Sequence, residues 1–226
     1  MNSPVRSQTA SIVSRYINPS STEKIAARIF SYFIHPLFIP VYVVIFLVYI
    51  HPSAFTGFSP LEKRQTVFIV MLNCVFYPLI SVVLLRAVGF IESVYLHTKK
   101  DRIIPYMACG IFFFWAYTVF KQQPAYPRLL PSFLLGIFLA SSAGLIANIY
   151  YKISLHAMGM GGWLCFFLIL FINNSMHMTW PLASVILLTG IVLTSRLMVS
   201  DHTTKEMYSG LIVGILTQFV AAFFVL

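Results

Sequence analysis

Apolar and polar residues follow one another along this chain in long blocks. Seven apolar segments can be marked, at roughly 29–50, 66–90, 103–120, 129–151, 153–172, 180–200 and 207–226. Several approach the ~20 residues that an α-helix needs to cross the hydrocarbon core of a bilayer. A helix that is apolar on every side is typical of a membrane or of a large buried core. The pattern predicts an all-α, polytopic transmembrane helical bundle with six to seven spans.

The start of the chain is more polar than the rest. Its composition predicts a polar N-terminal tail or surface helix over 1–28, followed by one transmembrane domain over 29–226. The stretch NPSSTEK is typical of a helix start, with Ser20 or Ser21 as the capping residue and Glu23 in the first turn. We therefore expect a helix to begin here, before the first apolar segment.

The composition supports a membrane location. Hydrophobic residues make up 59% of the 226 residues and charged residues only 9%, whereas an average soluble domain is ~25% charged. In so apolar a chain, the net charge of +9 suits anionic lipid headgroups better than nucleic acid. We thus expect the lipid bilayer as a partner, and no nucleic acid. Cys74, Cys109 and Cys165 lie inside apolar segments and are interpreted as packing residues.

Seven spans would place the connecting segments alternately on two membrane faces. The N-terminus and the segments 91–102, 151–154 and 200–206 share the first face, together with eleven of the fifteen Lys and Arg residues. The four on the second face are Lys63, Arg64, Lys121 and Arg128. The positive-inside rule then places the first face in the cytoplasm. We expect an integral protein of the cell (inner) membrane.

Three polar patches fall at span ends on this first face. They are TKKDRIIPY (98–106), KISLHAMG (152–159) and SRLMVSDHTTKE (195–206). Ionisable groups at membrane depth are costly, so they mark function more often than in soluble proteins. Because an even number of spans separates each pair of patches, we predict that all three meet in one polar cavity at one membrane face.

The third patch carries the most suggestive chemistry. His202 and Glu206 are four residues apart and are therefore neighbours on one helix face. A carboxylate there can accept a hydrogen bond from one imidazole nitrogen and leave the other free as nucleophile or base. His156 of the second patch adds another imidazole, and Arg196 adds a guanidinium. Two imidazoles ringed by cations suit a phosphoryl group.

Each of these residues also has a structural interpretation. A histidine near a span end is often interfacial, and basic residues at span ends usually anchor the helix. His35, in FIHPLFIP, is interpreted as a packing or interfacial residue, or as part of the rim of a site. A metalloenzyme with His156, His202 and Glu206 as ligands is disfavoured by the surrounding cations and the lack of closely paired histidines. The coincidence of histidines, arginines and a carboxylate on one face favours a functional site.

The stretch SR-LMVSD-H places a Ser-Arg pair five residues before a histidine. This spacing resembles the third signature of the type 2 phosphatidic acid phosphatase superfamily, with Arg196 and His202 at the matching positions. That family usually continues with three residues and an Asp. Here the position is Glu206, which keeps the carboxylate and adds one methylene.

Two further stretches carry the resemblance, which covers about half of the chain, from 98 to 210. ISLH resembles the second signature, Pro-Ser-Gly-His, at Ser154 and His156, with Ile and Leu in place of Pro and Gly. The first signature is Lys, six residues and Arg-Pro. KKDRIIP offers Arg102, but its lysines lie too close to the arginine and the proline stands three residues beyond it.

The resemblance implies a helical-bundle lipid phosphatase that needs neither a metal nor another cofactor. By analogy, His202 is the nucleophile that forms a phosphohistidine, Glu206 orients it and His156 is the general acid. The phosphate-binding residues would be Arg102, Ser154 and Arg196, with Lys99, Lys100 and Lys152 as secondary candidates. Members of the family generally act at an extracytoplasmic face, whereas the charge count favours a cytoplasmic one, so the side of the site stays open.

Two functions follow as hypotheses. The first is an integral membrane phosphatase that hydrolyses a lipid phosphate monoester or diphosphate, such as a phosphatidate, a phosphatidylglycerophosphate or a polyprenyl phosphate. The alternative is a non-enzymatic protein of the same fold that binds or transports lipid phosphates, which the altered signatures keep open. Both have a membrane lipid phosphate as the partner, and the sequence predicts no particular oligomeric state.

Overall fold

The computed structural model describes residues 20–91, 99–151, 153–173, 175–199 and 202–226, and every regular element in these ranges is helical. The α-helices are α2 (Ser21–Phe33), α3 (Ile39–Ile45), α4 (Pro60–Met71), α5 (Tyr77–Ala87), α6 (Lys99–Lys121), α7 (Leu129–Tyr150), α8 (Leu155–Asn173), α9 (Ser175–Val199) and α10 (Thr204–Val225). Two π-helical turns, η1 (Phe46–Ile50) and η2 (Leu72–Phe76), continue α3 and join α4 to α5. The predicted all-α class is confirmed.

Among the described residues, six helical segments are long and apolar enough to cross a membrane. They are Pro60–Ala87, Asp101–Lys121, Leu129–Tyr150, Leu155–Asn173, His177–Val199 and Thr204–Val225. A shorter apolar helix, Ile39–Ile50, accompanies them. The chain is thus an integral membrane protein, within the predicted range of six to seven spans.

The first predicted span, 29–50, is not one continuous helix. As expected, α2 begins with a capping box, in which the backbone N–H of Ser20 donates to the Glu23 carboxylate at 2.8 Å. The helix ends at Phe33 and resumes only with α3. Pro36 explains the break, because proline has no N–H to donate and disfavours a helical conformation in the residue before it. As a result, α2 runs across the predicted boundary between the tail and the transmembrane domain.

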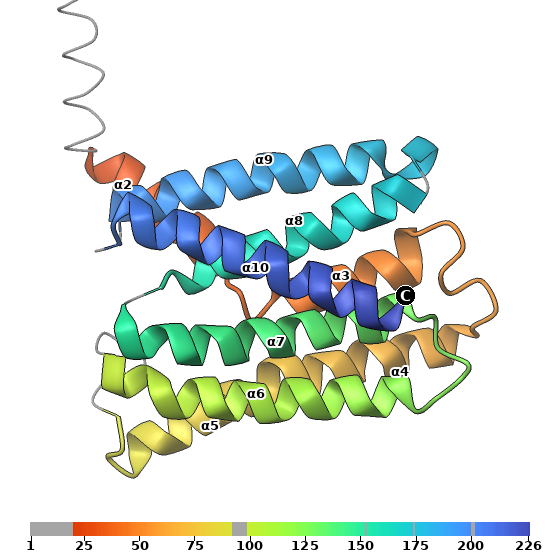
Figure 1. Cartoon of the computed structure of the whole chain (residues 1–226), viewed down its shortest axis with the longest axis horizontal. Coiled ribbons are helices and arrows are strands. Elements are labelled where there is room, and N and C mark those ends of the chain that lie inside the picture. Colours follow the sequence, from red (N-terminus) through yellow and green to blue (C-terminus); the bar gives the residue numbers. More distant parts are fainter. Residues whose placement is uncertain (1–19, 92–98, 152, 174, 200–201) are drawn as a thin grey trace, which may run out of the picture.

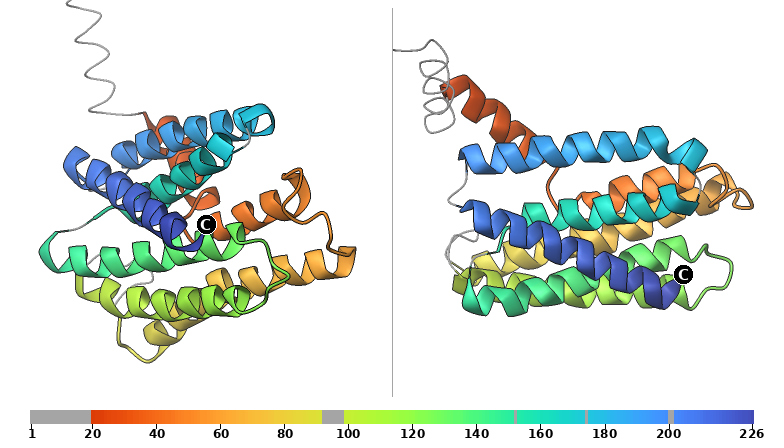
Figure 2. Two further views of the ribbon diagram at one scale, coloured as in Figure 1. Left: turned by 45° about the vertical axis from the view of Figure 1, so that its right-hand side comes forward. Right: turned by 45° about the horizontal axis from the view of Figure 1, so that its top comes forward.

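The long helices lie side by side, with their connections at the two ends of the bundle (Figure 1). One end holds α2, the first turns of α6, α8 and α10 and the last turns of α7 and α9, while the C-terminus lies toward the other end. Helix α2 runs obliquely to the bundle beside α9 (Figure 2). The three polar patches of the sequence therefore belong to one end of the bundle, which we call the site end.

Helices α8 and α10, which begin at the site end, pack backbone to backbone. A Cβ atom added at Gly214 would collide with the carbonyl oxygen of Met158, and one added at Gly161 would collide with that of Leu211. At Gly210 the added atom would lie 2.7 Å from the carbonyl oxygen of Ser154. These glycines hold the helix that begins beside His156 close to the helix that begins beside His202.

The largest buried cluster among the described residues is rich in aromatic rings. The ring centroids of Phe46 and Phe167 are 4.7 Å apart, and those of Phe133 and Phe166 are 5.0 Å apart. Aromatic pairs at such distances pack favourably beyond the area they bury. This cluster ties α3 and α7 to α8.

Candidate functional site

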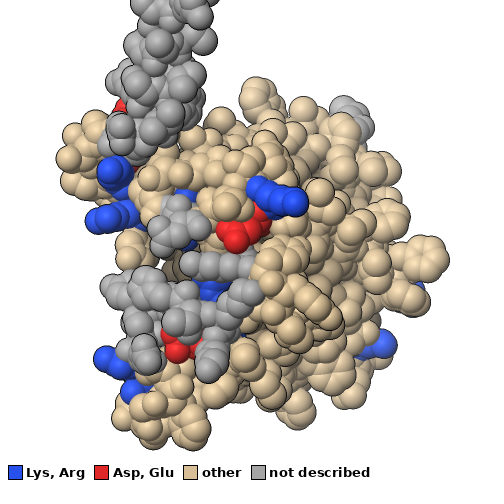
Figure 3. Space-filling view, turned by 60° about the vertical axis from the view of Figure 1, so that its left-hand side comes forward, with Lys and Arg blue, Asp and Glu red and all other residues tan. Residues whose placement is uncertain are grey.

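A cavity of about 790 Å³ extends into the bundle from the site end. The histidines and arginines that line it are Arg28, His35, Arg102, His156, Arg196 and His202. Most of the remaining lining is apolar and comes from α3, α5, α6, α7 and α8. Figure 3 looks onto the site end, where Lys and Arg side chains gather. Arg102, His156 and His202, one from each patch, line the same cavity, as predicted, but most of its lining is apolar and not polar.

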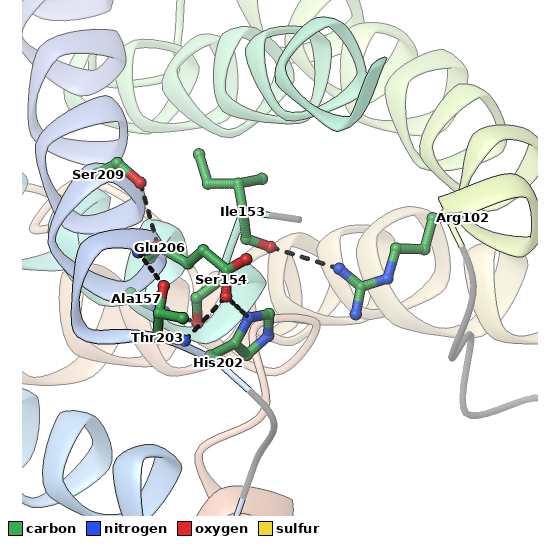
Figure 4. A network of polar contacts seen from close by, with 8 residues as sticks. All are labelled: Arg102, Ile153, Ser154, Ala157, His202, Thr203, Glu206 and Ser209. Carbon is green, nitrogen blue, oxygen red and sulfur yellow. Dashed lines mark hydrogen bonds and ion pairs between the residues drawn. The ribbon is translucent and has the colours of Figure 1, made fainter. Parts of the chain in front are cut away.

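His202 stands just before α10, and Glu206 holds it there. The Glu206 carboxylate lies 3.3 Å from His202 Nδ1 and accepts the backbone N–H of Thr203 at 2.9 Å (Figure 4). In return, the Thr203 hydroxyl oxygen accepts the Glu206 backbone N–H at 3.3 Å. Glu206 therefore closes a capping box and orients the imidazole at the same time. Since a carboxylate only accepts, Nδ1 carries the proton and Nε2 keeps a free lone pair.

The surroundings of His202 favour its neutral form. Burial of the ring lowers the pKa of His202 below its ordinary value, and the positive charges of Arg102 and Arg196 lower it further. The hydrogen bond with Glu206 acts in the opposite direction but does not reverse the shift. A neutral imidazole with one free nitrogen is the form that can attack an electrophile.

His156, in the first turn of α8, contacts residues from the N-terminal part of the chain. Its Nε2 lies 3.2 Å from the carbonyl oxygen of Ser31 on α2, so Nε2 carries the proton and donates it there. Its ring meets that of His35 edge to face, with centroids 5.1 Å apart. His156 also lies within electrostatic reach of Arg196 and His202.

His35 belongs to the site and not merely to its rim. It lies in the break between α2 and α3, where its Nδ1 accepts the backbone N–H of Leu37 at 3.3 Å. Burial, together with the charge of Arg196, lowers the pKa of His35 to about 4. The ring is therefore neutral at pH 7, and its proton lies on Nε2.

Two arginines reach the cavity from different helices. Arg102, buried on α6, donates from Nη1 to the carbonyl oxygen of Ile153 at 3.4 Å, which ties the start of α6 to the start of α8 (Figure 4). Arg196 lies in the last turn of α9 and lines the cavity. Guanidinium groups bind phosphate oxygens through paired N–H donors. The two arginines thus place groups that can bind an anion in the cavity that both imidazoles line.

The remaining predicted site residues divide into two groups. Ser154 is fully buried, its hydroxyl oxygen accepts the Ala157 backbone N–H at 3.4 Å, and it is not part of the cavity lining. It caps the first turn of α8, so the structure brings it close to the site but not into the cavity. Lys152 lies outside the described residues, and Lys99 and Lys100 are described only as the first backbone positions of α6.

Sequence reasoning missed several lining residues. Ser31 of α2 and Tyr106 of α6 line the cavity with hydroxyl groups that are buried and make no hydrogen bond within the described part of the chain. Arg28 lies at the exposed rim. A signal was present, because Tyr106 follows Arg102 by four residues, and Arg28 and Ser31 are spaced by three, so each pair shares one helix face.

The described His, Cys, Asp and Glu side chains form no group of three or more that could hold a metal ion. The metalloenzyme hypothesis requires His156, His202 and Glu206 to form such a group, and they do not. Comparisons with protein-family models, curated proteins and solved structures find no match for this chain.

Proposed function

We propose that this protein is a metal-independent phosphatase of the cell (inner) membrane that hydrolyses a lipid phosphate through a phosphohistidine on His202. The observation that carries the proposal is one shared cavity. This cavity is lined by a histidine that Glu206 orients, by two guanidiniums and by a second imidazole, and it continues between apolar residues into the bundle. The signature-like spacing of Arg196 and His202 supports the same chemistry.

The proposed reaction begins with attack of His202 Nε2 on phosphorus. The bond from phosphorus to the lipid oxygen breaks, and the imidazole becomes a positively charged phosphohistidine. Arg102 and Arg196 hold the equatorial oxygens while negative charge develops on them. Glu206, hydrogen-bonded to Nδ1 at 3.3 Å, stabilises the positive ring.

His156 serves the two proton transfers. When the leaving group is an alcohol, its oxygen must receive a proton, and the protonated form of His156 supplies it from Nδ1, because its Nε2–H donates to Ser31. In the second half of the reaction, His156 takes a proton from water, and the water oxygen attacks phosphorus. The N–P bond breaks, inorganic phosphate leaves and His202 returns to its neutral form.

The apolar part of the cavity suits a lipid chain. Leu79 and Val83 of α5 line the cavity, and each exposes 51% of its surface, so this side of the cavity lies within reach of the bilayer. Ile137 of α7 lines the same space. A lipid phosphate could therefore place its chain among apolar residues while its phosphate meets the arginines, which a soluble phosphate ester could not do.

The test is phosphate release by the purified full-length protein in detergent micelles, over a panel of lipid monophosphates and diphosphates. We expect release by the wild type and an acid-labile, base-stable phosphoryl label that disappears in His202→Ala. His177→Ala is the matched control, because His177 is an exposed histidine on α9 outside the cavity lining. Binding of the lipids without any release would favour the alternative, a non-enzymatic lipid-phosphate binding or transport protein.

A further inference from the structure

Helix α2 and the break after it carry a second set of polar groups, outside the three signature-like stretches. Arg28, Ser31 and His35 follow one another at spacings of three and four, which places Arg28 and Ser31 on one face of α2 and His35 just beyond its end. All three line the cavity. We call these three residues the α2 set.

The α2 set offers hydrogen-bonding groups to the cavity. Ser31 is 5% exposed, yet its hydroxyl has no partner among the described residues. An unpaired buried hydroxyl is unfavourable, so such a group beside a cavity indicates a bound polar ligand. His35 accepts from Leu37 through Nδ1, so its Nε2–H is a further donor. A hydroxyl, an N–H and the Arg28 guanidinium suit an anion.

The position of the α2 set separates it from the nucleophile. Ser31 and His35 contact His156, through the 3.2 Å hydrogen bond and the ring contact, whereas His202 is held by Glu206. If a phosphoryl group lies between His202 and His156, its leaving oxygen points toward His156. The α2 set then surrounds whatever is attached to that oxygen.

The charges of the lining match an anion larger than a monophosphate. Three guanidiniums line the cavity, from Arg28, Arg102 and Arg196. The Glu206 carboxylate, which also acts on Arg102, is hydrogen-bonded to His202 and is not part of the described lining. A phosphate monoester carries at most about two negative charges at neutral pH. A lipid diphosphate carries one more, on the phosphate attached to the leaving oxygen.

We propose that the α2 set binds the inner phosphate of a lipid diphosphate, so that the substrate is a lipid diphosphate rather than a monophosphate. This inference rests on the proposed function. His202 attacks the terminal phosphorus, the bond from it to the bridging oxygen breaks, and the bridging oxygen leaves with the lipid monophosphate. Water then splits the phosphohistidine and releases inorganic phosphate. The leaving phosphate needs no proton, so this substrate depends less on His156 than an alcohol does.

The experiment compares geranylgeranyl diphosphate with geranylgeranyl monophosphate as substrates of the full-length protein. In Arg28→Ala and in Ser31→Ala, we expect the ratio of kcat/KM for the diphosphate to that for the monophosphate to fall about tenfold, the size of a lost hydrogen bond to a charged group. Lys24→Ala is the matched control, since Lys24 lies one turn earlier on α2, is exposed and does not line the cavity. An unchanged ratio in both variants overturns the inference.

A second measurement separates failure of this inference from failure of the proposed function. Inorganic diphosphate and inorganic phosphate are titrated against the wild type, Arg28→Ala and Lys24→Ala. We expect tighter binding of diphosphate by the wild type and by Lys24→Ala, with the difference lost in Arg28→Ala. If neither lipid is hydrolysed but this pattern holds, the proposed catalysis is wrong and the α2 set remains a diphosphate site. Equal affinities in the wild type overturn the α2 set whatever the activity.

Discussion

Histidines reach the cavity in two different ways. At the α9–α10 junction, His202 and its partner Glu206 are four residues apart, and a single capping box sets their geometry. The other histidine, His156, meets Ser31, which is 125 positions away in the chain, and His35, which lies in the break between α2 and α3. One half of the site is therefore built within one helical turn, and the other half exists only after distant helices have packed.

This difference predicts unequal tolerance to substitution. The local half should lose chemistry while it keeps its shape, because the capping box forms from neighbouring residues. The assembled half should respond through orientation and ionisation, because its parts are held by packing. The variants below test that distinction, from the largest expected effect to the smallest.

His202→Ala should give the largest loss. Removal of the nucleophile should lower phosphate release by at least ~10³-fold, as loss of a nucleophile does in other covalent enzymes. The fold should persist, because the Thr203–Glu206 capping box does not need the imidazole. Thermal unfolding checks the fold and phosphate release checks the chemistry. Turnover close to that of His177→Ala would show that another group is the nucleophile.

Arg196→Lys should lower turnover by ~10²-fold, although the charge is kept, because an ammonium cannot reproduce the paired donors of a guanidinium. The loss should appear in kcat as well as in KM, since the equatorial oxygens gain charge in the transition state. The measurement is steady-state kinetics on one lipid phosphate. Near-normal kcat would mean that Arg196 only anchors the end of α9.

Glu206→Gln should have an intermediate effect and separates the two roles of this residue. A glutamine can still close the capping box, so thermal stability should change little. The ring of His202 loses the carboxylate that stabilises its positive charge, and turnover should fall at least tenfold. Glu206→Asp should keep substantial activity, because the carboxylate is retained. Equal losses in both variants would instead indicate a purely structural role.

His35→Gln should have the smallest effect on turnover but should change the dependence of stability on pH. The folded state holds the pKa of His35 at about 4, whereas the unfolded chain has the ordinary value of 6.5. Between these values the unfolded state binds more protons, so the wild type should lose stability as the pH falls from 6.5 towards 4. Thermal midpoints over this range should decrease less in His35→Gln. Identical pH profiles would show that His35 is not buried in its neutral form.

Burial and charge also predict how activity depends on pH. Because the pKa of His202 is lowered, first by burial and then by the two arginines, its neutral form should persist below pH 6.5. The acid limb of the kcat/KM profile should therefore lie below pH 6.5. It should move to higher pH when Arg196 is replaced by an uncharged residue, because the positive charge that lowers the pKa of His202 is lost. An acid limb that does not move would mean that it reports another group.

The sequence by itself determined the features that depend on neighbouring residues. Hydropathy alone predicted the six long helical spans, since a lipid-facing helix must be apolar along its length, but the predicted span at 29–50 is broken at Pro36. The i to i+4 spacing predicted that His202 and Glu206 meet, and the helix-start pattern predicted the cap formed by Ser20 and Glu23. In each case, the interacting atoms lie within one or two turns, where helix geometry leaves few alternatives.

Only the tertiary structure decided which distant groups share the cavity. The break at Pro36 and the packing of α2 beside α9 bring Ser31 and His35 to His156, and no local pattern specifies that contact. Ser154 is buried as a cap of α8, although its place in the sequence suggested a phosphate ligand. Side-chain direction in a membrane bundle depends on how closely neighbouring helices approach. Here the glycines of α8 and α10 set that approach, and their effect becomes apparent only when the two helices are side by side.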